Sequence, residues 1–495
     1  MGLCLPLAVL IGYFLAEPME SGSIAVVILV MAVLSVPLLM KWYHPLLLLS
    51  WNATITPFFI PGRPVLWMIM GLIGLFFAVL NRSVSANRPF INVPAITRSL
   101  IFLAVVVAGT AFLTGGIGIR SLGSNHYGGR GYFFMFSAIA SYFAFTSQRI
   151  PLHRAASALK MYFLPGITAM IPNVAYLAGP GAYFLFSFFP VEEASGQAAA
   201  DNALGPTIMR LGGAAGASIA VYSYLLARYG VRGTLDLSRP WRLLLFLLAT
   251  LGCVIGGYRG VILLFGLTFA VTFWLEGLWR TRFLPILGGA VLLVGTIAFA
   301  QADKLPWSIQ RAISFLPVQI DPLVKSNAEG STKWRVEMWK MVLPQIPKYL
   351  FKGKGYALDP GDIYLAQQSA GRGLDATGES GSALVGDYHN GPLSVIIPFG
   401  IYGMIGFLWF LGAGIQVLVS NYRFGDPALR YVNTFFLSTF VAKAIFFFLI
   451  FGSIAYDLAF FAGLLGLAVS INGKPRTAAG VPEQMPEEEY AFSQT

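Results

Sequence analysis

Three short motifs carry the side chains best suited to chemistry, and each contains an arginine or a histidine. Arg259 lies in GGYRG, Arg335 in STKWRVEMW and His389 in DYHNGP. A planar guanidinium binds phosphate oxygens through two parallel hydrogen bonds. An imidazole titrates near neutrality and can accept a proton from a hydroxyl group. These residue types therefore suit the binding of a phosphorylated substrate and the activation of a hydroxyl on a second one.

Two of the motifs also have a simpler structural interpretation. Arg259 separates two apolar stretches so closely that its side chain can snorkel to the membrane surface instead of facing a cavity. His389 precedes an apolar run that begins at Leu393, so it can serve as a capping or interfacial residue at a helix start. Both interpretations stay open on the sequence alone.

The third motif predicts an amphipathic helix near residues 332–343. Thr332 is placed to cap its start, and Arg335, Trp339 and Val342 fall on one face. Such a helix would lie on the membrane surface and present a cation at the level of the lipid headgroups. It can act there either as an interfacial anchor or as part of a site.

A fourth, glycine-rich stretch contains two further arginines. GGIGIR holds Arg120, and NHYGGRG holds Arg130. Backbone amides freed by glycine can cradle phosphates, but no phosphate-loop consensus is present and loop flexibility also explains the glycines. We count Arg120, Arg130 and Arg210 as further candidates for phosphate or sugar contacts, together with Asn390 and Trp339.

The composition places the elements that position these residues in a membrane. Of 495 residues, 56% are hydrophobic and 11% charged, and the mean hydropathy is +0.70, whereas soluble proteins contain about 25% charged residues. Apolar runs of about 20 residues predict an all-α polytopic membrane protein with about 14 transmembrane helices, and at least about 12. Their expected starts are near residues 3, 22, 45, 64, 98, 131, 161, 211, 242, 260, 283, 392, 431 and 454.

The distribution of positive charge predicts the side of each connection. The net charge of +11 comes from Lys and Arg residues that gather in alternate short connections. This arrangement fixes topology, and it does not indicate nucleic-acid binding. The short connections on the opposite side hold only Arg63, Arg120, Arg130, Arg210 and Arg259. The positive-inside rule therefore places both termini in the cytoplasm and Arg259 on the outer face.

These patterns divide the chain into four regions. Residues 1–300 hold the first eleven predicted helices, and residues 301–391 form a large periplasmic loop domain that includes the amphipathic helix. Residues 392–472 hold the last three helices, and residues 473–495 form a disordered cytoplasmic tail. The third predicted helix, residues 45–60, contains Asn, Thr and Pro and is expected to be broken or re-entrant.

The sequence offers no motif for a metal or a nucleotide. It contains no Asp-x-Asp pair and no cluster of His or Cys at ligand spacing. Cys4 and Cys253 both lie in apolar segments. We therefore expect no metal and no cofactor, and a chemistry that uses preformed cations and one base.

The order, side and spacing of the three motifs resemble the O-antigen ligase and polymerase family of bacterial envelope glycosyltransferases. The resemblance covers roughly residues 240–420 and includes GKG at residues 353–355 and GIYGMIG at residues 400–406. It implies an all-helical, GT-C-like membrane glycosyltransferase of the bacterial inner membrane, with its active site on the periplasmic face. The earlier helices match only in hydropathy.

The resemblance also implies an activity and roles for residues. The family transfers a glycan from an undecaprenyl-diphosphate carrier to an acceptor hydroxyl, with inversion and without a metal. Its two essential arginines correspond to Arg259 and Arg335, and its histidine to His389; Tyr258 stands where many members have serine. The guanidiniums would hold the diphosphate, and the imidazole would take the proton of the acceptor or orient it. Lipid A core, a growing polysaccharide and a protein hydroxyl all stay open as acceptors, and membrane lipids surround the protein.

The alternative function is a secondary transporter or flippase of lipid-linked sugars. Such proteins carry charged residues within several helices. Here Lys443 lies within a predicted helix and Asp457 near the start of the next, where the two can also form a structural ion pair. A single large loop on one side favours the enzyme.

Overall fold

The computed structural model describes residues 9, 12, 21–60, 62–84, 90–117, 129–189, 211–357 and 388–475, which contain helices and no β-strand. The α-helices are α2 (Ser21–Trp51), α3 (Leu66–Val84), α4 (Pro94–Thr114), α5 (Gly129–Phe145), α6 (Ala155–Phe163), α7 (Met170–Ala178), α9 (Gly212–Thr234), α10 (Pro240–Ile255), α11 (Arg259–Leu275), α12 (Phe283–Ala300), α13 (Trp307–Ile313), α14 (Pro322–Val342), α15 (Ile346–Tyr349), α18 (Gly391–Phe424), α19 (Arg430–Leu449) and α20 (Ile454–Asn472). Short 3-10 helices are η2 (Leu152–Arg154), η3 (Leu164–Ala169), η4 (Pro180–Ser187), η5 (Leu278–Arg280), η6 (Ala302–Lys304), η7 (Leu343–Gln345) and η9 (Pro427–Leu429).

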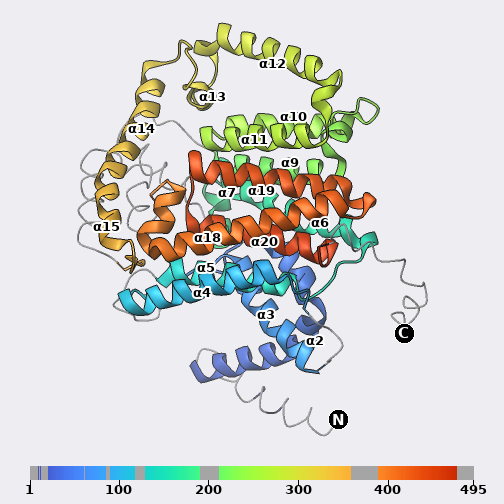
Figure 1. Cartoon of the computed structure of the whole chain (residues 1–495), viewed down its shortest axis with the longest axis vertical. Helices are drawn as coiled ribbons and strands as arrows, with labels where there is room; N and C mark the ends of the chain where they lie inside the picture. Colours follow the sequence, from blue (N-terminus) through green and yellow to red (C-terminus); the bar gives the residue numbers. More distant parts are fainter. Residues whose placement is uncertain are drawn as a thin grey trace.

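The long helices form one bundle around α20 (Figure 1). α20 packs against α5, α18 and α19, while α9, α10 and α11 extend the bundle beyond α19. Glycines in α20 allow close approach, because a side chain at Gly463 would collide with Trp51 and one at Gly466 with Phe145. Small residues have this role where membrane helices cross, since packing holds such helices together in lipid.

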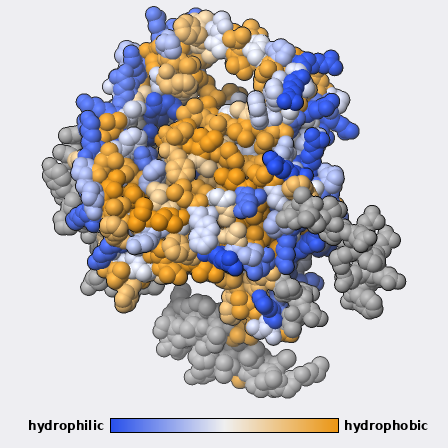
Figure 2. All heavy atoms as spheres, viewed as in Figure 1, coloured by the Kyte–Doolittle hydropathy of each residue, from blue (hydrophilic) through white to orange (hydrophobic). Residues whose placement is uncertain are grey.

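The surface of the bundle confirms a polytopic membrane protein. Apolar side chains cover its middle, and hydrophilic ones gather mainly at the margins that the helix ends reach (Figure 2). Within the described ranges, eight helices are long and apolar enough to cross a membrane. They are Val33–Trp51, Leu66–Val84, Pro94–Thr114, Leu152–Ala178, Phe283–Ala300, Gly391–Phe424, Pro427–Leu449 and Ile454–Asn472. The predicted count of about 14 stays a prediction, and most of the first expected helix lies outside the described residues.

The second and third predicted helices are not separate. α2 runs continuously through the expected boundary, and it ends at Trp51. The expected break in residues 45–60 is present from Asn52 onward. Asn52 donates a hydrogen bond to the carbonyl of Tyr162 (2.7 Å), and the backbone N–H of Thr56 donates to the carbonyl of Phe188 (2.7 Å). Non-helical backbone is stable at membrane depth where other protein segments satisfy its polar groups.

The helices of the predicted outer loop gather at one end of the bundle. α13, α14 and α15 lie at the left of Figure 1, at the opposite end from the C-terminus. The predicted amphipathic helix is present, but it begins at Pro322 and not near Thr332. Asp321 caps this start by accepting a hydrogen bond from the N–H of Leu323 (2.8 Å), and proline at the first position favours a helix start. Residues 358–387 of the loop lie outside the described residues.

Helix α12 stands apart from the bundle. It follows η5 along the chain and arches away from α10 and α11 (Figure 1). None of its side chains is buried, although they are almost all apolar, and Leu292 is 72% exposed. α12 is therefore largely exposed, with only Phe283 and Leu287 partly buried against the bundle, and it leads into η6 and α13.

Candidate functional site

Helix α14 is the element along which the expected site residues meet. Arg259 begins α11 and reaches α14, where its Nη2 donates to the carbonyl of Ala328 (3.2 Å). Its Nη1 donates to the hydroxyl of Ser314, just beyond α13 (3.5 Å). Arg259 is therefore directed at α14 and the end of α13, and its side chain is held by protein groups.

Arg335 lies on the same face of α14 as Ala328, which Arg259 contacts. The two positions are about two turns apart, so their backbones are separated by about 10 Å along the helix axis. Helical side chains lean towards the N-terminus of their helix. The side chain of Arg335 therefore begins in the direction of the Arg259 guanidinium, and the two cations border the same stretch of α14.

His389 occupies the last turn of chain before α18, in a strained conformation. Its φ is +49°, in the left-handed region that residues other than glycine rarely adopt. The imidazole lies between two aromatic rings, with centroid distances of 5.5 Å to Trp334 and 5.0 Å to Phe451. Strain of this kind persists only where surrounding contacts enforce it, and it is concentrated at functional sites.

Burial and a neighbouring cation change the protonation of His389. Desolvation, followed by the positive charge of Arg335, lowers the pKa of the imidazole from 6.5 to about 4. Both effects disfavour the charged form. Arg335 and His389 are therefore close enough to interact electrostatically, and the imidazole is neutral at physiological pH.

Asn390 and Trp339 fix the segment that carries His389. Asn390 caps α18, since its side-chain oxygen accepts a hydrogen bond from the N–H of Leu393 (3.1 Å). The indole N–H of Trp339 donates to the carbonyl of Tyr388 (2.8 Å). The apolar face of α14 is thus covered by protein, and the expected position of this helix at the membrane surface stays a prediction. Trp334, Met338 and Val342 of α14 are buried against Tyr388, Leu393 and Ile397.

The GKG turn at residues 353–355 docks on a kink in α18. Gly400 interrupts that helix with a φ of +64°, which frees the carbonyls of Ile397 and Pro398. These accept hydrogen bonds from the N–H groups of Lys354 (2.8 Å) and Gly355 (2.9 Å). The end of the α14–α15 segment is thereby attached to the helix that starts beside His389.

Of the three further arginine candidates, the structure describes only Arg130. Arg130 is exposed in the first turn of α5, next to Gly131, where a side chain would collide with Tyr356. Helix α5 packs on α3, α4 and α20. Arg120 and Arg210 lie outside the described residues.

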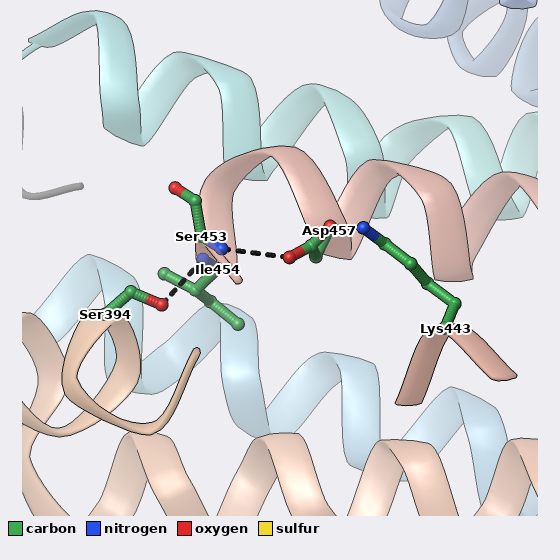
Figure 3. A network of polar contacts seen from close by, with 5 residues as sticks. All are labelled: Ser394, Lys443, Ser453, Ile454 and Asp457. Carbon is green, nitrogen blue, oxygen red and sulfur yellow. Dashed lines mark hydrogen bonds and ion pairs between the residues drawn. The ribbon is translucent and has the colours of Figure 1, made fainter. Parts of the chain in front are cut away.

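Lys443 of α19 and Asp457 of α20, the basis of the transporter alternative, form an ion pair (Figure 3). Asp457 also accepts a hydrogen bond from the N–H of Ser453 (2.9 Å), and the N–H of Ile454 donates to the hydroxyl of Ser394 in α18 (2.9 Å). This network fixes the turn after α19, whose Phe451 packs on His389.

The sequence did not reveal Arg311 or Phe451 as parts of this site. Arg311 is one of several cations in the loop, and Phe451 is one of 40 phenylalanines. Neither has a distinguishing local pattern, and their importance comes from contacts with distant segments. For Arg311, the single available sequence signal was the position of an arginine within a short, mainly apolar stretch, WSIQRAI.

The class of protein follows from this geometry: a multi-pass membrane protein with two arginines and a histidine gathered at one end of its helices. The model of the O-antigen ligase family matches residues 244–408. This segment runs from α10 to beyond the kink of α18 and includes Arg259, Arg335 and His389. The resemblance inferred from the sequence is confirmed over these residues. The match supports a glycan-transferring role of ligase or polymerase type. No curated protein matches the chain significantly.

Proposed function

We propose that the protein is a metal-independent, inverting glycosyltransferase that moves a glycan from undecaprenyl diphosphate to an acceptor hydroxyl at the periplasmic face of the bacterial inner membrane. The observation that carries this proposal is the placement of Arg259, Arg335 and His389 along α14. In the O-antigen ligase family, the donor is a lipid-linked glycan. A diphosphate leaving group and a hydroxyl nucleophile match the two guanidiniums and the imidazole.

The arginines would act on the leaving group. Cleavage of a sugar–diphosphate bond develops negative charge on the diphosphate oxygens. Fixed guanidiniums in a partly dry site stabilise that charge more in the transition state than in the ground state. Loss of either Arg259 or Arg335 should therefore raise the barrier by about 2 to 4 kcal/mol.

His389 would orient the acceptor hydroxyl and take its proton as the oxygen attacks the anomeric carbon. With a pKa of about 4 the imidazole is unprotonated in the free protein, but it is a weak base. A bound diphosphate would offset the charge of Arg335 and raise this pKa, so the base would strengthen when the donor is in place. A single displacement inverts the anomeric configuration.

The test uses purified protein in lipid nanodiscs with an undecaprenyl-diphosphate glycan, offering lipid A core, a second donor and a peptide in turn. We expect transfer to one acceptor class, unchanged by EDTA, with inverted configuration in the product. His389→Ala and Arg335→Ala should lose at least about a hundredfold in rate. Lys325→Ala, an exposed change on α14, is the matched control. Wild-type turnover by His389→Ala or Arg335→Ala would refute the assignment, and uptake of intact donor into proteoliposomes would favour a flippase.

A further inference from the structure

Arg311 lies beside Arg259 and joins two elements of the site. Its side chain is almost fully buried, with the residue 4% exposed. Nη1 donates to the carbonyl of Gly257 (3.1 Å), and Nε donates to the side-chain oxygen of Asn327 (2.9 Å). One guanidinium therefore connects the turn that precedes Arg259 with the first half of α14.

The contact with Gly257 depends on the backbone of that turn. Gly257 has a φ of +75°, which glycine adopts readily and other residues do not. Its carbonyl accepts the hydrogen bond from Arg311 while the chain reverses into α11. Gly257, the second glycine of GGYRG, thus has a structural role that the motif alone does not reveal.

Ser314 links Arg311 to Arg259 itself. The Ser314 hydroxyl donates to the carbonyl of Arg311 (2.8 Å) and accepts from Nη1 of Arg259 (3.5 Å). Because Arg259 also donates to Ala328, next to Asn327, both arginines reach the same turn of α14. α13 therefore sets how α11 and α14 are placed relative to each other.

We propose that Arg311 is a positioning residue that fixes the spacing between the guanidiniums of Arg259 and Arg335, so that together they select a diphosphate over a monophosphate. The inference rests on the proposed function of this site. α14 continues without interruption from Asn327 to Arg335, and a helix transmits a displacement of its first half to its second. A diphosphate can contact both guanidiniums, whereas a monophosphate contacts one. A change in the spacing between the guanidiniums therefore weakens diphosphate binding more than monophosphate binding.

Lysine cannot replace arginine in this role. A guanidinium presents several donors in a rigid planar fork, and Arg311 uses two of them on partners from different elements. An ammonium on a flexible stem keeps the charge but does not hold both partners in one geometry. Arg311→Lys therefore separates the effect of position from the effect of charge.

The experiment measures binding of farnesyl diphosphate and farnesyl monophosphate to the purified full-length protein by calorimetry. Wild type should prefer the diphosphate, and Arg311→Lys should reduce that preference about tenfold, equivalent to about 1.4 kcal/mol. Asn327→Ala removes the side chain that accepts from Nε of Arg311, at an exposed position, and should also reduce the preference for the diphosphate. Arg242→Lys is the matched control, because Arg242 lies at the opposite end of α10 and donates to the carbonyl of Gly233 in α9 (3.2 Å). This control should keep the wild-type preference.

The outcomes are distinct. A wild-type preference that Arg311→Lys and Asn327→Ala both retain would overturn the positioning role, and so would an equal loss in Arg242→Lys. If Arg311→Lys does not fold, Asn327→Ala decides the question. A wild-type protein that does not prefer the diphosphate would overturn the proposed function itself, before the role of Arg311 arises.

Discussion

The ammonium nitrogen of Lys443 in α19 lies 2.7 Å from a carboxylate oxygen of Asp457 in α20, with both side chains largely buried (Figure 3). Removing one partner of a buried ion pair leaves an uncompensated charge and costs about 3 to 5 kcal/mol, whereas removing both is far less damaging. We expect Lys443→Met and Asp457→Asn each to lower the thermal midpoint in detergent strongly, and the double variant to recover much of the loss.

The control for this pair lies between the same two helices. Asn433 and Asn472 exchange two hydrogen bonds at the opposite end of α19 and α20 (3.0 and 2.8 Å). Asn433→Ala should lower the thermal midpoint without reducing glycan transfer by the remaining folded protein. Asp457→Asn should reduce that transfer as well, because its turn carries Phe451. A double variant less stable than either single variant would contradict the ion-pair interpretation.

The pH dependence of transfer should reflect the lowered pKa of His389. The neutral imidazole is the active form, and burial together with Arg335 lowers its pKa in the free protein to about 4. The value of kcat/KM should therefore stay constant as the pH falls from neutrality to about 5, and decline only below that. An unperturbed histidine would already lose activity below about pH 6.5. A decline centred there would show that the imidazole is not in this environment.

Replacing Arg335 with glutamine should move the acidic side of the pH–activity profile (the acid limb), where activity falls as the pH is lowered, to higher pH. Removal of a nearby positive charge makes the imidazolium less unfavourable, so the pKa of His389 rises. We expect a lower maximal rate and an acid limb at higher pH, measured on the residual activity or by carbon NMR of labelled histidine. Arg335→Lys keeps the charge and should leave the limb near its wild-type position. A limb that moves to lower pH in Arg335→Gln would contradict the proximity of the two residues.

The kink in α18 should be sensitive to a single methyl group. Gly400 has a φ of +64°, and a side chain there would meet the carbonyl of Leu350. Gly400→Ala should therefore lower the free energy of unfolding by about 1 to 3 kcal/mol from backbone strain alone, which lowers the thermal midpoint, and it should weaken the docking of the GKG turn. Gly412 lies in the same helix with open space around it, so Gly412→Ala is the control and should be neutral or slightly stabilising. Equal effects of the two changes would show that the kink is unimportant.

The sequence predicted the helices well where the signal was local. Long apolar runs, and the motifs around Arg259, Arg335 and His389, can be recognised in the sequence because each consists of neighbouring residues. The start of α14 was placed too late, although Asp321 and Pro322 are a recognisable start signal. Thr332 instead lies inside the helix and donates to the carbonyl of Ala328 (3.2 Å).

Contacts between distant segments could not be read in the same way. Arg311 matters because it meets Gly257 and Asn327, and these partners become neighbours only when α11, α13 and α14 pack. The same holds for Phe451, whose ring reaches His389 from the turn after α19. Side chains of this kind have no periodic or compositional pattern, so the sequence predicted candidate reacting groups but not the residues that hold them in place.

Because α12 packs little against the bundle, we expect the surrounding lipid to affect the position of this helix and of the site helices that follow it. This helix has no buried side chain, so we expect acyl chains to surround most of it, and its far end continues into η6 and α13. Bilayer thickness affects the tilt of a membrane helix. We therefore expect a change of thickness that tilts α12 to displace α13 as well, because a short segment connects the two helices. If the proposed function holds, binding of the lipid-linked donor should thus depend on the species of phospholipid around the protein as well as on the residues of the candidate site.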